Sequence, residues 1–283
     1  MLSSRTKYIL YSLELLTLVG LALFLRPTKT YRVVGDMESH GIRFMSARSL
    51  LCVEKGYLDP ERIGELSREI DKYINNIENL LGKPLNNNRY LDSRIHFIIS
   101  SQHLISTASN RYYTDRIPRI ILSYANAETT PYIHELVHII ACDSCKWFAE
   151  GLAVYVNKRL NGPDAWPNYG RDLDDVAASY FKNDYLLKDN AVKILKLIGS
   201  DAYLVYDEKK LLERDPDKSL DYEMFYLLSG SFVQYLFEHI DKKVFMRIYG
   251  SGDWRESFLV ETGKPVEVWK QNWLNAILSK QTK

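Results

Sequence analysis

The pentapeptide H-E-L-V-H at residues 134–138 constrains this chain more than any other feature. On an α-helix, His134 and His138 lie one turn apart on the same side, with roughly 6 Å between their Cβ atoms. Both imidazoles can therefore bind one metal ion. Glu135 points about 100° away from His134, so it is poorly placed as a ligand but can reach a water molecule beside the ion.

The flanking residues favour the helix that this geometry requires. Thr130 is a suitable N-cap residue, and Pro131 suits the first helical position. Apolar residues then recur at helical spacing and form one face: Ile133, Leu136, Val137 and Ile140. We therefore expect a helix that packs against a core and presents both histidines to one site.

A third ligand is needed, because two imidazoles do not complete a metal site. Glu150 lies among apolar and small residues in the segment W-F-A-E-G-L-A-V-Y, residues 147–155. A carboxylate in such a setting is costly to bury unless it binds a metal or pairs with a basic side chain. Two His and one Glu, with a fourth position for water, form a catalytic zinc set. The sequence predicts one Zn²⁺ on His134, His138 and Glu150, with Glu135 as general base.

The two segments together resemble the gluzincin clan of zinc metallopeptidases, and most closely the peptidase MA-like domain family, in which W-x-x-E-G-L-A-x-Y follows the H-E-x-x-H helix. The segment Y-L-L-S-G-S-F-V-Q-Y-L at residues 226–236 is similar to the downstream helix of that family. So is Thr262-Gly263 leading into Trp269 and Trp273. The resemblance covers residues 31–283. It implies an α+β, zincin-like fold and a zinc-dependent metallopeptidase that acts on a peptide or protein substrate.

One position departs from the pattern of the clan, and one strand corresponds to an element of its architecture. In its thermolysin-like branch an Asp lies one turn after the ligand Glu and orients a ligand His, whereas this chain has Val154 there. A strand in the place of residues 119–123 lies at the sheet edge in the clan and pairs with an extended substrate. The resemblance implies that role here, and the alternative is an ordinary core strand.

Four further residues are candidates for the site or its support. Tyr226 could donate a hydrogen bond to the developing oxyanion, and the alternative is a core tyrosine in a chain with 20 Tyr. Gly230, one turn later, would let its helix approach closely. Cys142 and Cys145 could form a disulfide, act as a redox switch or remain thiols. We expect the disulfide, because the apolar N-terminal segment indicates an oxidising compartment.

Residues 8–25 form a nearly continuous apolar run, preceded by Arg5 and Lys7. Its 18 residues are at the lower limit for a transmembrane helix. Small residues that would mark a signal-peptide cleavage site are lacking around Arg26, and a soluble helix would not be apolar on all sides. We expect residues 1–30 to form a single-pass signal anchor, with the catalytic domain outside the cytoplasm.

The remaining pattern divides the metallopeptidase domain, residues 31–283, into two lobes. An α/β lobe at residues 31–125 is predicted to contain strands at 31–34, 41–45, 94–99 and 119–123 and a helix from residue 60 to Gly82. A helical lobe at residues 126–283 contains the zinc site, with further helices at 221–240, 242–249 and 265–279. No strong strand is expected after residue 123.

Composition limits the classes of function. With 37 Lys+Arg and 36 Asp+Glu the net charge is 37 − 36 = +1, which argues against a nucleic-acid partner. Two other functions stay open from the sequence: a catalytically inactive zincin-fold binding protein at the membrane, and a metal-dependent hydrolase of a non-peptide bond. The sequence indicates no oligomeric state.

Overall fold

A computed structural model of the chain describes most of the domain expected after the N-terminal segment. The residues it describes are 40–85, 90, 92–101, 106–109, 116–123, 125, 129–141, 145–182, 185–201 and 216–280. The expected membrane anchor, the expected strand at residues 31–34 and Cys142 lie outside this set, so the predicted disulfide with Cys145 stays a prediction. Within these residues, every helix is too short or too polar to cross a membrane.

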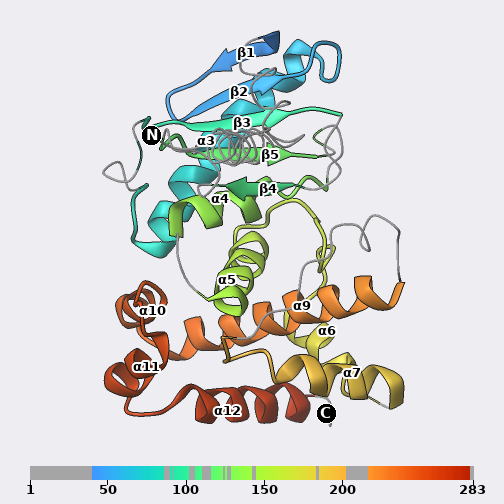
Figure 1. Cartoon of the computed structure of the whole chain (residues 1–283), viewed down its shortest axis with the longest axis vertical. Coiled ribbons are helices and arrows are strands. Elements are labelled where there is room, and N and C mark those ends of the chain that lie inside the picture. The colour runs from blue at the N-terminus through green and yellow to red at the C-terminus, as the bar shows by residue number, and fades with distance from the viewer. Residues whose placement is uncertain are drawn as a thin grey trace, which may run out of the picture.

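The fold is α+β, with a five-stranded mixed sheet followed by a group of helices (Figure 1). Strands β2, β3 and β5 run parallel, and β1 and β4 are antiparallel strands at the two edges. The order across the sheet is β1-β2-β3-β5-β4. The strands are β1 (Ile42–Met45), β2 (Ser49–Val53), β3 (Ile95–Ile99), β4 (Thr107–Ser109) and β5 (Arg119–Leu122).

The edge strand nearest the helices is β4, not the strand expected from the sequence. The implied edge position of residues 119–123 is wrong, because β5 pairs with β3 on one side and with β4 on the other. All four residues of β5 are buried, as in a core strand. The strands at residues 42–45 and 95–99 are confirmed, whereas β2 and β4 were not predicted.

Helix α3 (Pro60–Leu81) packs against the sheet and has the bounds expected from the sequence. Pro60 begins it after the extended residue Asp59, and Gly82 ends it with a left-handed φ of 64°. Its buried apolar side chains recur at helical spacing: Ile63, Leu66, Ile70, Ile74, Ile77 and Leu81.

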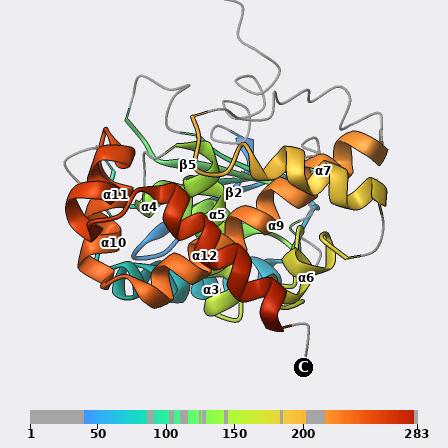
Figure 2. The same ribbon diagram turned by 90° about the horizontal axis from the view of Figure 1, so that it is seen from below.

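The second half of the domain is helical, as predicted. Helix α4 contacts both the sheet and α5, while α9 runs across the helical half beneath them (Figures 1 and 2). The helices are α4 (Tyr132–Ala141), α5 (Lys146–Arg159), α6 (Leu173–Ser179), α7 (Tyr185–Leu195), α9 (Pro216–His239), α10 (Lys242–Tyr249), α11 (Trp254–Thr262) and α12 (Val266–Ser279).

Helices α5 and α9 cross very closely, as Gly230 led us to expect. A Cβ atom on Gly230 would lie 2.7 Å from Cγ1 of Val154, and one on Gly151 would lie 2.5 Å from the Ser229 carbonyl oxygen. A larger side chain at Gly151 would displace the backbone of α9, and one at Gly230 would displace the Val154 side chain. This crossing fixes α9, which carries Tyr226, against α5, which carries Glu150.

Candidate metal centre

Helix α4 places both motif histidines on one side, as the spacing predicted. Nearly every residue of α4 is buried, because the helix is enclosed by α3, α5 and the sheet. The rings of His134 and His138 are 4.8 Å apart between centroids, and their Nε2 atoms are 3.1 Å apart. His134 is buried, and His138 is partly accessible. The helix therefore presents two imidazole nitrogens at one point.

Helix α5 brings Glu150 to the same point. Its Oε2 atom lies 3.0 Å from Nε2 of His134 and 3.3 Å from Nε2 of His138. Only 3% of Glu150 is exposed. The three side chains form a candidate metal site, with one potential ligand atom from each.

The spacing of these atoms suits a single ion. Ligands held tetrahedrally about 2.0–2.2 Å from one ion lie roughly 3.3–3.6 Å from each other. The three atoms here are 3.0, 3.1 and 3.3 Å apart. Two imidazole N–H groups can also share Oε2 of Glu150 as acceptor, so the triangle by itself does not require an ion. The three atoms are close enough together for one cation to bind all of them.

Glu150 is a carboxylate in this environment. Its burial opposes ionisation, but His138, His134 and Lys146 together hold its pKa well below the usual range. The ammonium group of Lys146, one turn earlier on α5, contacts Oε1 of Glu150. The ion pair considered as the alternative role for Glu150 is therefore present beside the two imidazoles.

Glu135 lies next to this group without joining it. Its carboxylate accepts a hydrogen bond from the backbone N–H of Ala108 on β4. Burial raises its pKa to about 7, and Glu150 adds to this rise while His134 opposes it. A carboxyl group with such a pKa can take up and release a proton near neutral pH.

Tyr226 on α9 also lies at the site. Its ring stacks on that of His134, with 5.9 Å between centroids and an interplanar angle of 17°. The ring of Trp166, in the segment between α5 and α6, also packs against the Tyr226 ring, with 4.8 Å between their centroids. Tyr226 therefore lies near the candidate metal ligands, as predicted. The role of its hydroxyl group as a hydrogen-bond donor stays a prediction.

Three participants were missed from the sequence: Lys146, Ala108 and Trp166. Lys146 carries a signal that could have been used, since it precedes a buried Glu by one helical turn. Ala108 and Trp166 carry none, because only the tertiary fold brings them to the site. Val154, at the position of the thermolysin-like Asp, is buried in the crossing with α9, where an ionised side chain would be costly.

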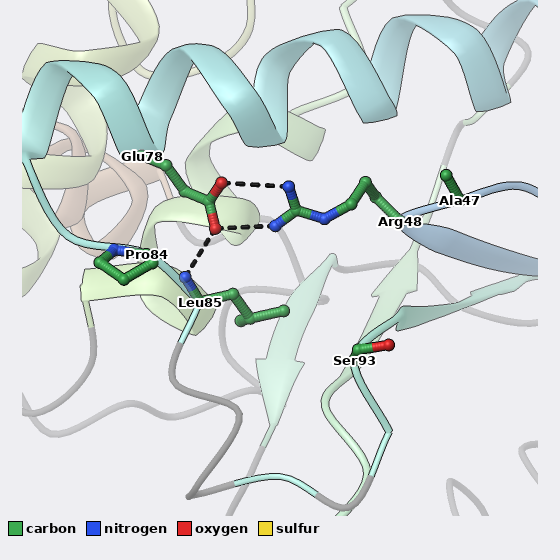
Figure 3. Close-up of a pocket in the computed structure, with 6 residues that line it drawn as sticks. All are labelled: Ala47, Arg48, Glu78, Pro84, Leu85 and Ser93. Atoms are coloured by element: carbon green, nitrogen blue, oxygen red, sulfur yellow. Dashed lines mark hydrogen bonds and ion pairs between the residues drawn. The ribbon is translucent and has the colours of Figure 1, made fainter.

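A pocket of about 280 Å³ lies away from this centre, beside the starts of β2 and β3 (Figure 3). Its charged side chains, Arg48 and Glu78, pair with each other through two hydrogen bonds of 3.1 and 2.7 Å. None of the metal-site residues lines it. The pocket therefore has no part in the candidate chemistry.

Comparisons of the chain with protein-family models, with curated proteins and with solved structures gave no match.

Proposed function

We propose that this protein is a zinc-dependent metallopeptidase of the gluzincin type, with a zincin-like fold. One observation carries the proposal: two imidazoles and a carboxylate converge, and a second buried carboxyl group lies beside them on α4. A ligand set of two His and one Glu favours zinc over magnesium or calcium, which prefer oxygen ligands.

His134, His138 and Glu150 would hold the ion, which supplies Lewis acidity for activating water and a substrate carbonyl. Glu135 takes the proton of the attacking water on its carboxylate and passes it to the leaving amine. Tyr226 donates its phenolic hydrogen to the oxygen on which negative charge develops.

The position of strand β4 is an argument for a peptide or protein substrate. Among the strands of the described residues β4 pairs with β5 alone, so its outer side is an edge. An edge strand can hydrogen-bond an extended peptide backbone and tolerate varied side chains. The contact between Ala108 and Glu135 places this edge next to the proposed general base.

We also propose that the protein is anchored in a membrane by residues 8–25, with the catalytic domain outside the cytoplasm. The support is the apolar run of 18 residues between basic flanks. Alkaline extraction of membranes that contain the full chain tests the anchor. Release of the protein into the supernatant would contradict it.

Cleavage of a peptide library by the full chain tests the activity. The wild type and Glu65→Gln, which changes only an exposed carboxylate on α3, should cleave peptides, lose activity with a chelator and regain it with zinc. Glu135→Gln should keep its zinc and lose turnover by about 10² to 10⁴-fold. A zinc-loaded wild type that cleaves no peptide would refute the peptidase. Turnover of ester or amide substrates would then indicate a hydrolase of a non-peptide bond. No turnover of any of these substrates would indicate a binding protein.

A further inference from the structure

The two carboxylate oxygens of Glu150 have different partners. Oε2 faces the imidazoles at 3.0 and 3.3 Å, whereas Oε1 contacts the ammonium group of Lys146. Lys146 lies four residues before Glu150 on α5, the spacing at which helical side chains meet. The contact therefore gives the two oxygens different roles: Oε1 pairs with the lysine, and Oε2 is left as the candidate metal ligand.

This separation has a physical consequence for the ligand. The terminal torsion of a Glu side chain is soft, so burial alone does not determine which oxygen faces the site. A carboxylate without a second partner can turn and offer both oxygens to one ion. The charge-assisted contact with Lys146 holds Oε1 away from the imidazoles and leaves Oε2 to them.

We propose that Lys146 is a positioning residue of the metal centre, which keeps Glu150 a one-oxygen ligand and so preserves an open position for water. The inference rests on the proposed function, since it requires that the site binds a metal. Partners that orient a ligand typically change metal affinity about 10 to 100-fold when they are removed.

The ammonium charge also repels a divalent ion, and this effect acts in the opposite direction. It is the weaker effect, because the Lys146 side chain is half exposed and solvent screens its charge. Direct contact with a buried carboxylate is screened much less. Removal of the amine should therefore weaken zinc binding rather than strengthen it.

The test uses the full chain in four forms: wild type, Lys146→Met, Lys146→Arg and Lys193→Met. Lys193 is an exposed lysine on α7 and controls for the loss of one positive charge. Zinc affinity is measured by competition with a chromophoric chelator, and the ligand geometry by the visible absorption of the Co²⁺ form.

Lys146→Met should bind zinc about 10-fold more weakly and show a weaker Co²⁺ absorption, because a two-oxygen ligand raises the coordination number. Lys146→Arg should restore both values, and Lys193→Met should match the wild type. The apo form of Lys146→Met should unfold at a lower temperature than the others, because it loses the contact that lowers the pKa of Glu150, so zinc affinity is compared at a temperature at which all four forms are folded. Equal or tighter zinc binding by Lys146→Met, with an unchanged Co²⁺ spectrum, would overturn this inference alone. A wild type that binds no zinc would overturn the proposed function as well.

Discussion

Gly151 lies directly against the backbone of Ser229, where α5 crosses α9. A Cβ atom on Gly151 would approach the Ser229 carbonyl oxygen to 2.5 Å and Cγ2 of Val233 to 2.7 Å. Gly151 follows Glu150 in the sequence, and Ser229 lies one turn after Tyr226. The closeness of the two helices therefore sets the separation between a candidate metal ligand and the proposed oxyanion donor.

Gly151→Ala should destabilise the protein by about 1–3 kcal/mol, because the added methyl group forces the two helices apart. Urea unfolding measures this free energy. Gly252→Ala is the matched control, since a Cβ atom there has no neighbour within 4 Å and both changes affect the unfolded chain alike. Equal stability of the two variants would show that the crossing tolerates the methyl group.

Some elements were predictable because their signals are local. Helix α3 begins at Pro60 and ends before Gly82, and its apolar residues repeat at helical spacing between these limits. Strand β2 reads S-L-L-C-V and is buried on both faces, so it lacks the alternation that marks a half-buried strand. Strand β4 has three residues, and its identity depends on pairing with β5. Only the folded chain reveals such elements.

Loss of one imidazole should strongly weaken metal binding at this centre. The pure wild type should carry one zinc after loading, whereas His138→Ala should bind it more than about 100-fold more weakly, because a ligand contributes more than an outer partner does. Elemental analysis after gel filtration measures the content. His239→Ala, which changes an exposed histidine on α9, should retain the wild-type value. Full zinc content in His138→Ala would exclude this residue as a ligand.

The candidate metal ligands and the groups around them differ in how far the sequence could reveal them. His134, Glu135 and His138 were predictable because a single helix fixes their relative positions. Glu150 was predictable because a lone acid in an apolar segment needs a partner. The hydrogen bond from Ala108 to Glu135 joins an edge strand to α4, and no local pattern encodes that contact.

The carboxylate of Glu78 should stabilise the fold only at pH values at which it is ionised. Arg48 and the backbone N–H of Leu85 hydrogen-bond its carboxylate (Figure 3). Burial opposes ionisation, but these contacts outweigh it and lower the pKa of Glu78. A pKa that is lower in the folded state adds stability above the unfolded value of about 4.3, and this stability is lost as the pH falls through the folded value.

Glu78→Gln should therefore be less stable than the wild type by about 1 kcal/mol at pH 7, with the difference shrinking as the pH falls below about 4. Thermal unfolding of both proteins across this pH range measures the effect. Glu65→Gln, on the same helix, removes only an exposed pair with Arg62 and should show little change at any pH. A deficit in Glu78→Gln that persists at low pH would assign the loss to packing rather than to charge.

Tyr226→Phe separates the proposed donor from an aromatic packing residue. The substitution keeps the ring that stacks on His134 and removes only the hydroxyl group. If that group stabilises the oxyanion, kcat should fall about 100-fold with little change in KM, and zinc content should be unchanged. Tyr235→Phe, on the same helix but stacked on His239, should have the wild-type kcat. An unchanged kcat in Tyr226→Phe would leave the tyrosine a packing role, because the ring contact with His134 survives in the variant.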